Sequence, residues 1–424
     1  MTSSAEDGRA QLTGTRTLER PAVAGSGIAG LRPAGPRWLW SWLLGRLQSR
    51  AVVVPVALWA VAHALIFGWA LCVRAVVLVA SGHAAALSPV TLFFRWDSLY
   101  FASIAEHGYV GPESGPTWAA FFPGFPASAR VALAMVGVPH PDPEQIVIAL
   151  EAVAAVASLV AALLVWRLAH HRYGDRVAVA ATLLFVLGPY ALFLVAPYSE
   201  ALFVAFALGA WLCAERGRWL SAGLLAAGAS FTRIDGLFLI AGLAVLVAVR
   251  LRARGEPYLL KALGTATIGG AGIGVYWAAL WAWTGNPAAW FVAQHLGWHR
   301  ALNWPWVSLG NTVAFIFVPP AQHQLQNAAD LVFAALIVTG LVVLIRRRQW
   351  GAAAYVGLTA VAMMTSTTYL SIARASAILF PLTILAATTV TDPRRRWIFA
   401  TVLGAGLVLL AVNTALFVNG VWVD

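Results

Sequence analysis

The sequence predicts an all-α polytopic membrane protein with about eleven transmembrane helices. Two observations support this prediction. Only 11% of the 424 residues are charged, 60% are hydrophobic, and the mean hydropathy is +0.77; a soluble domain carries about 25% charged residues. Several apolar runs also reach the ~20 residues that a helix needs to cross a bilayer. This composition excludes a soluble globular enzyme, a disordered chain and a disulfide scaffold.

The chain begins with a polar stretch and continues as a series of apolar runs. Residues 1–36 are rich in Gly, Ser, Thr, Arg and Pro, so we expect a disordered cytoplasmic tail there. Residues 37–424 form the transmembrane domain, which opens with an amphipathic segment at 37–50. The spans are expected at roughly 51–73, 146–167, 177–196, 199–214, 219–232, 236–250, 261–283, 328–345, 350–370, 375–391 and 397–418.

The basic residues orient these spans. With a cytoplasmic N-terminus, 22 of the 28 Lys and Arg residues fall in cytoplasmic segments, as the positive-inside rule requires. These segments are 1–50, 167–176, 215–218, 250–261, 346–348 and 394–396. A crossing within 119–138 would invert every later loop, so this run is expected to be re-entrant or to lie in the outer interface, where Pro123 and Pro126 break a straight helix.

The outer face then carries the long loops, at about 74–145 and 284–327. The second loop and its edge are rich in Trp, which indicates either an interfacial aromatic belt or a platform for carbohydrate or lipid headgroups. The single lysine, Lys261, in an Ala-, Arg- and Trp-rich chain is typical of a GC-rich bacterium. We therefore expect a multi-pass protein of a bacterial plasma membrane.

Ionisable residues are concentrated at the outer ends of the predicted spans, where burying them is costly and marks a candidate functional site. The set comprises Asp97, Glu106, His107, Glu200, Arg233, Asp235, His295, His299, Arg300 and Arg374. Its three arginines run against the positive-inside trend. They either bind an anion such as a phosphate or pyrophosphate, or form buried ion pairs with Asp97, Glu200 and Asp235.

Two patterns within this set have alternative interpretations. Residues 94–109 (FRWDSLYFASIAEHGY) are expected to form a short helix that Asp97 begins and Gly108 ends, so Asp97 is either a helix cap or a general base at the membrane surface. His295 and His299 are spaced to share a helix face for a metal ion. The intervening Gly297 and the missing acidic partner make that signal weak, and no metal ligand is assigned.

Several sequence blocks together resemble the GPI mannosyltransferase II (PIG-V) family, including its bacterial relatives. They occur in the family's order and extend over about residues 90–380. The blocks are RWDSLYFASIAEHGY (95–109), AFFPGFP (120–126), APYSEALF (196–203), FTRIDGLFL (231–239) and a late Arg374 with a following Pro381.

The resemblance implies a glycosyltransferase with a GT-C-type fold, which transfers a mannosyl residue from a polyprenyl-phosphate donor. The acceptor would be an extracytoplasmic glycolipid, polysaccharide or protein. By the same resemblance the catalytic carboxylate is Asp97, acting as general base in a reaction with inversion. No Asp-x-Asp motif for a nucleotide sugar is present, and a divalent metal remains an open alternative.

Substrate binding is expected from residues around this carboxylate, with Arg374, Arg233 or Arg300 neutralising the leaving phosphate. The residues assigned to it are Arg95, Trp96, Tyr100, Glu106, His107, Phe122, Tyr198, Glu200, Arg233, Asp235, His295, His299, Arg300 and Arg374. A transporter or flippase of a lipid-linked saccharide is the main alternative function, but it would show internal repeats and charges near mid-membrane. A non-catalytic subunit is the third, and it would tolerate Asn at position 97.

Overall fold

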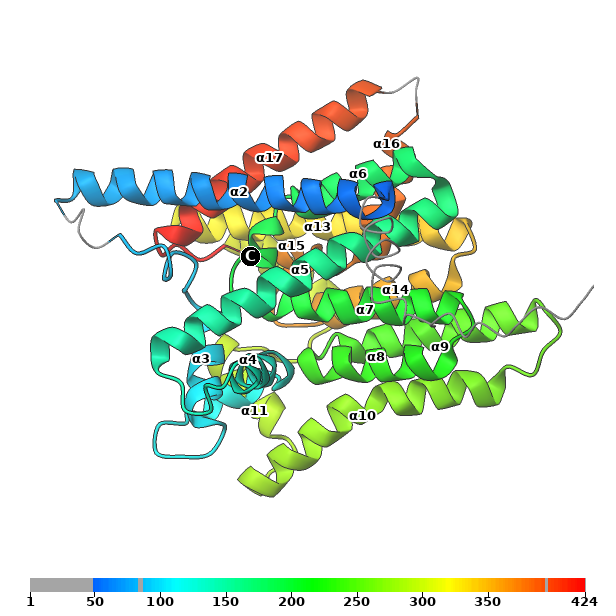
Figure 1. Cartoon of the computed structure of the whole chain (residues 1–424), viewed down its shortest axis with the longest axis horizontal. Coiled ribbons are helices and arrows are strands. Elements are labelled where there is room, and N and C mark those ends of the chain that lie inside the picture. Colours follow the sequence, from blue (N-terminus) through cyan, green and yellow to red (C-terminus); the bar gives the residue numbers. More distant parts are fainter. Residues whose placement is uncertain (1–48, 83–86, 393–395, 424) are drawn as a thin grey trace, which may run out of the picture. The chain divides into compact units, whose positions relative to one another are not determined.

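The computed structural model describes residues 49–82, 87–392 and 396–423, and every regular element in these ranges is a helix (Figure 1). The prediction of an all-α protein is therefore confirmed. The expected tail at 1–36 and most of the amphipathic segment at 37–50 lie outside the described residues. The elements are α2 (Arg50–Ala80), α3 (Asp97–His107), η2 (Pro116–Ala120), α4 (Gly124–Met135), α5 (Pro143–Tyr173), α6 (Asp175–Val186), η3 (Ala191–Leu194), α7 (Ser199–Glu215), α8 (Trp219–Thr232), α9 (Gly236–Arg252), α10 (Leu259–Thr284), α11 (Ala289–Trp298), α12 (Pro305–Phe315), α13 (Ala321–Arg346), α14 (Trp350–Met364), α15 (Ile372–Ala375), α16 (Phe380–Val390) and α17 (Arg396–Val418).

Five of the described helices are long and apolar enough to cross a membrane: α2, α5, α10, α13 and α17. The apolar helices α8, α14 and α16 are shorter. Apolar helices of membrane-spanning length confirm a multi-pass membrane protein, whereas the count of eleven spans stays a prediction.

Two expected spans are interrupted. The run 177–196 divides into α6 and η3, because Pro189 disfavours helical geometry at the residue before it and cannot donate a backbone hydrogen bond. In the run 375–391, Ala375 ends α15 and the next helix begins only at Phe380, and α14 ends at Met364 rather than near 370. These corrections leave irregular chain at 187–198 and 365–379, interrupted only by the short helices η3 and α15, and both stretches carry candidate site residues.

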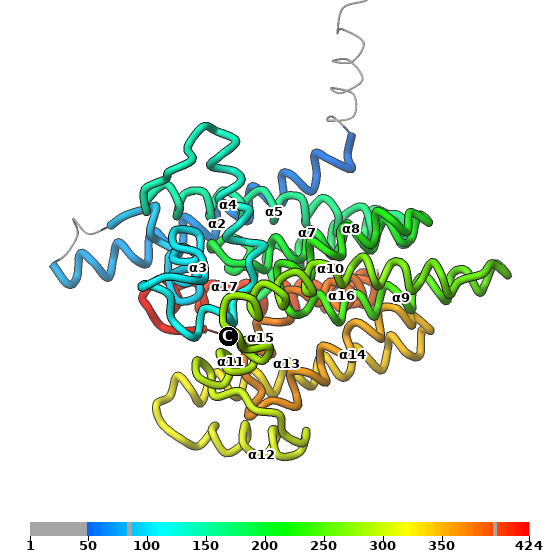
Figure 2. The backbone as a smooth tube through the Cα atoms, turned by 90° about the horizontal axis from the view of Figure 1, so that it is seen from below, coloured from blue at the N-terminus to red at the C-terminus, as the bar shows by residue number. Residues whose placement is uncertain are grey.

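The run 119–138 contains no spanning helix. It forms η2 and then α4, which has 12 residues and is therefore about 18 Å long, well short of the ~30 Å hydrocarbon core. Helix α4 packs against α3 and α5. Figure 2 shows α3, α4 and α11 together at one end of the bundle.

Helix α5 is the centre of the packing, in contact with α2, α4, α6 and α7. Half of the residues in the apolar stretch of α5 are buried, whereas 17% are buried in that of the peripheral α2. Its start is fixed by a capping box, in which the Gln145 amide donates to Asp142 Oδ1 at 2.9 Å and the Asp142 amide donates to Gln145 Oε1 at 3.0 Å. Its last turn carries His170, His171 and Arg172, which suits the negative end of the helix dipole.

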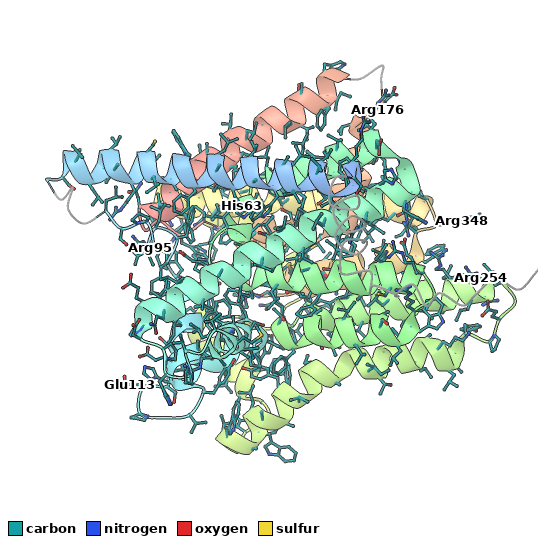
Figure 3. All side chains as sticks on the ribbon, viewed as in Figure 1. His63, Arg95, Glu113, Arg176, Arg254 and Arg348 are labelled. Atoms are coloured by element: carbon teal, nitrogen blue, oxygen red, sulfur yellow. The ribbon has the colours of Figure 1, made fainter. Side chains whose placement is uncertain are left out.

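Charged loops occupy the two ends of the bundle. Arg176, Arg254 and Arg348 lie toward one end, whereas Arg95 and Glu113 lie at the other (Figure 3). The three arginines belong to segments predicted to share one side of the membrane, and the other two residues belong to the long loop predicted for the opposite side. The fold is thus compatible with that division of the loops.

Candidate functional site

The segment that leads into α3 presents Asp97. Trp96 has a φ of 55°, so the chain turns sharply just before the helix begins. Behind it, the fully buried Tyr198 donates its hydroxyl proton to the carbonyl of Arg95 at 2.9 Å and accepts the Asp97 amide at 3.2 Å. Burial raises the pKa of the Tyr198 phenol, and the charge of Asp97 raises it further, so the hydroxyl stays a donor. Tyr198, in the block at 196–203, thereby anchors the turn formed by residues 95–97.

The Asp97 side chain makes no capping hydrogen bond, and the N-cap position of α3 is Trp96. Instead, Oδ2 accepts a hydrogen bond from Arg374 Nη1 at 2.8 Å. The carboxylate is 16% exposed, and the described residues contribute no hydrogen-bond donor to Oδ1. The geometry therefore favours a role other than capping for Asp97, whose side chain is partly exposed.

Five side chains form a network that we call the ion cluster: Asp97, Glu200, Arg233, Asp235 and Arg374. Glu200 Oε1 accepts from Arg374 Nε at 2.7 Å and lies 3.1 Å from Arg233 Nη1. Arg233 Nε donates to Asp235 Oδ2 at 3.0 Å. Three carboxylates and two guanidiniums leave the cluster with one formal negative charge. Arg233 and Arg374 thus form the ion pairs that were the alternative to anion binding.

The ion cluster is deeply buried on one side and open on the other. The side chains of Glu200 and Asp235 are 1% and 4% exposed, whereas Arg233 is 21% exposed. Glu200 Oε2 is buried without a hydrogen-bond partner. A buried carboxylate is tolerated only when it is paired, and Arg374 and Arg233 supply that pairing for Glu200.

Short structural elements hold Arg374 in place. Ser371, with a φ of 64°, begins the one-turn helix α15, and Asp330 Oδ1 accepts the backbone amide of Ala373 at 2.8 Å. The guanidinium carbon lies 4.5 Å from the centre of the Phe193 ring and 5.5 Å from that of Trp422, within the range of a cation–π contact. Arg374 is consequently clamped between carboxylates and aromatic faces.

Close backbone approaches position the turn that carries Arg233. A Cβ at Gly236 would lie 2.3 Å from the Ser230 Cα, and one at Gly124 would lie 2.8 Å from the Thr232 Cα. Glycine is therefore required at both positions. The AFFPGFP and FTRIDG blocks meet here, because α4 begins directly against the end of α8.

Aromatic residues continue the site along α3. Tyr100, one turn after Asp97, stacks on Phe121 with ring centres 4.5 Å apart, and Trp298 lies edge-on to Phe121 at 5.5 Å. Trp96 is 39% exposed and packs edge-on against Trp422. Phe122 is buried elsewhere, against Tyr276. The exposed rings near the ion cluster are Trp96 and the half-buried Tyr100.

The remaining predicted site residues lie outside the ion cluster. Glu106 and His107 pair at 3.5 Å on the exposed end of α3. His299 follows the end of α11 in a left-handed conformation, so it does not share a regular helix face with His295. Among the described residues, no three His, Cys, Asp or Glu side chains are grouped so that they could hold a metal ion. Two further residues lie nearby. The Arg95 guanidinium donates to the carbonyl of the preceding residue, Phe94, and Arg300 donates to the Leu370 carbonyl at 3.4 Å.

Three residues near the ion cluster were missed by the sequence analysis: Asp330, Phe193 and Trp422. Asp330 had a recognisable signal in the sequence, because it is the single acidic residue of α13, and in the structure it is only 2% exposed. Phe193 and Trp422 had none, because an aromatic residue in an apolar chain is unremarkable until its neighbour is known.

Arg233→Ala is expected to destabilise the protein by about 3–5 kcal/mol, because it leaves the buried Asp235 unpaired and Glu200 with one partner. The measurement is thermal unfolding in detergent. Arg130→Ala is the control, since the Arg130 guanidinium donates to the Pro139 carbonyl at the surface and should contribute about 1 kcal/mol or less. Equal losses in the two variants would contradict the buried pairing.

Comparison with known proteins gives the following similarities. Residues 51–251 match the family model described as mannosyltransferase (PIG-V). Among curated proteins, none matches the chain. Among solved structures, the Archaeoglobus fulgidus oligosaccharyltransferase complex with zinc and sulfate is 13% identical with a TM-score of 0.43, over 79% of this chain and 49% of that one. The archaeal oligosaccharyltransferase AglB from Archaeoglobus fulgidus, in complex with an inhibitory peptide and a dolichol-phosphate, is 12% identical with a TM-score of 0.41, over 83% of this chain and 56% of that one.

The chain thus spans about half the length of these two oligosaccharyltransferases. The matched family segment contains four of the five blocks noted in the sequence, and Arg374 lies beyond it. The similarity to the mannosyltransferase (PIG-V) family is thus carried by residues 51–251 of this chain.

Proposed function

We propose that this protein is an integral membrane mannosyltransferase that uses a polyprenyl-phosphate-linked donor, and that Asp97 is its general base. The match of residues 51–251 to the mannosyltransferase (PIG-V) family model supports the reaction class, which is glycosyl transfer. The observation that carries the assignment of the base is the Asp97 carboxylate: Arg374 engages one oxygen at 2.8 Å, and the side chain is partly exposed. The acceptor is an extracytoplasmic glycolipid, polysaccharide or protein.

The proposed step is a single displacement. Asp97 takes the proton of the acceptor hydroxyl, the acceptor oxygen bonds to the anomeric carbon, and the bond from that carbon to the phosphate oxygen breaks. The products are the glycosylated acceptor and a polyprenyl phosphate. One base suffices for this inversion, as in inverting glycosidases, where a single carboxylate activates the nucleophile.

The charge of the ion cluster bears on how the donor phosphate is bound. Arg374 already contacts two carboxylates, and the cluster as a whole is negative, so an incoming phosphate needs a further cation. Arg300 is proposed for this role, because it donates to Leu370, four residues before Arg374. Arg374 then holds Asp97 in position and shares the phosphate during the reaction.

The test of this function is a transfer assay. Purified protein in lipid is incubated with radiolabelled polyprenyl phosphate mannose and membrane extract, and the labelled product is identified. We expect a labelled glycoconjugate that survives the mild acid treatment which cleaves the glycosyl phosphate donor, and that is absent with Asp97→Asn. Equal labelling with wild type and Asp97→Asn would contradict the proposed base, and transport of intact donor without transfer would favour a flippase.

The proposed orientation has the ion cluster facing the outside of the cell. A single cysteine at position 254, in a background without Cys72 and Cys213, is expected to resist an impermeant thiol reagent in intact cells. A cysteine at position 113 should be labelled, since Glu113 lies at the opposite end of the bundle (Figure 3). Labelling of position 254 from outside would reverse the orientation and remove Asp97 from the extracytoplasmic side.

A further inference from the structure

A large apolar groove runs along the outside of the bundle, between α4, α5, α7 and α8. Its volume is about 710 Å³, within the range of small-molecule sites. Its lining includes the small residues Ala205 and Gly209 on α7, and Val156 and Val160 on α5, which are 63% and 40% exposed. The groove therefore opens toward the surroundings of the helices.

Two arginines close one end of this groove. Arg167, near the end of α5, and Arg216, directly after α7, both line it, and both are exposed. Within the described part of the chain neither has an acidic partner, although Arg172 one turn beyond is paired with Glu215. Two unpaired guanidiniums at the end of an apolar groove are complementary to a lipid that carries an anionic phosphate headgroup.

The groove lies away from the ion cluster. Glu200 is the second residue of α7 and Arg216 follows its last residue, so about 24 Å of helix separates them. A phosphate bound to Arg167 and Arg216 therefore cannot belong to the donor molecule that reacts at Asp97.

We propose that this groove is a specific binding site for an anionic glycerophospholipid. Its phosphate binds Arg167 and Arg216, and an acyl chain lies along Ala205 and Gly209. The headgroup is in the leaflet opposite the ion cluster. Because α7 packs against α5 and carries Glu200 of the ion cluster, the bound lipid stabilises the helix pair that supports the site.

Native mass spectrometry with equimolar phosphatidylglycerol and phosphatidylcholine tests the proposal. Wild-type protein is expected to retain one phosphatidylglycerol. The Arg167→Gln, Arg216→Gln double variant is expected to bind phosphatidylglycerol at least about ten-fold more weakly. Arg218→Gln is the matched control, since Arg218 is exposed in the same loop but does not line the groove. Asp97→Asn should retain the lipid, which separates this site from the transfer reaction.

A second variant tests the groove itself. Ala205→Trp fills part of the groove but keeps both arginines. It is expected to abolish retention of phosphatidylglycerol, and its cooperative thermal unfolding should show that the variant is folded. In wild type, bound lipid should slow alkylation of Cys213, which lines the groove, relative to Cys72 on α2. The proposal is overturned if the double variant keeps its preference for phosphatidylglycerol, if Arg218→Gln loses as much binding, or if equimolar polyprenyl phosphate displaces the lipid.

Discussion

Asp97→Asn is expected to lower turnover by about 10²–10⁴-fold, because an amide cannot take a proton from the acceptor hydroxyl. The fold should persist. Asp97 makes no capping bond to lose, and the Asn oxygen can still accept from Arg374 Nη1, so the loss of stability should be about 1 kcal/mol. The measurements are the transfer rate at saturating donor and the thermal unfolding temperature of the same preparation.

Asp142→Asn is the matched control for this substitution. Asp142 caps α5, which lies in the same end region as α3, and Asn caps a helix about as well as Asp. Both turnover and stability should therefore be unchanged. A stable Asp97→Asn protein that transfers the sugar at nearly the wild-type rate would exclude Asp97 as the base.

The helical class and many helix boundaries could be predicted from the sequence, because hydrophobicity over ~20 residues reflects the cost of exposing backbone in lipid. The prediction for 219–232 coincides with α8, and that for 199–214 ends one residue before the end of α7. The prediction of helix boundaries failed where a helix is interrupted inside an apolar run, as at Pro189 and before Phe380. Hydropathy does not detect a break whose residues are themselves apolar.

The ion cluster could be predicted only as a set of candidates. Sequence position indicated that Asp97, Glu200, Arg233, Asp235 and Arg374 share one end of the bundle, but not which would touch. Arg374 meets Asp97 across 277 positions of sequence, and such a contact depends on the packing of α3, α7 and α15. Trp422 and Asp330 were not predicted as site residues, because their roles come from contacts with the Arg374 segment that only the structure shows.

Arg374→Lys is expected to reduce turnover by about 10–100-fold with the fold intact. Lysine keeps the positive charge among Asp97 and Glu200 but loses the planar fork that contacts both. A base displaced by about 1 Å loses activity on the order of 10²-fold. Arg374→Ala is a harsher change, because it leaves two partly or fully buried carboxylates with less compensation, and it is expected to lower stability by about 3–5 kcal/mol.

The kinetics of Arg374→Lys distinguish two roles for this arginine. If Arg374 mainly holds Asp97, kcat falls, the KM for the donor is nearly unchanged, and Arg374→Lys adds little further loss to Asp97→Asn, because residues that act as a unit are strongly non-additive. If Arg374 mainly binds the donor phosphate, the donor KM rises and the losses of the two variants multiply. The 2.8 Å contact with Asp97 and the negative charge of the ion cluster favour the first pattern. A multiplied loss in the double variant would instead assign Arg374 to the phosphate.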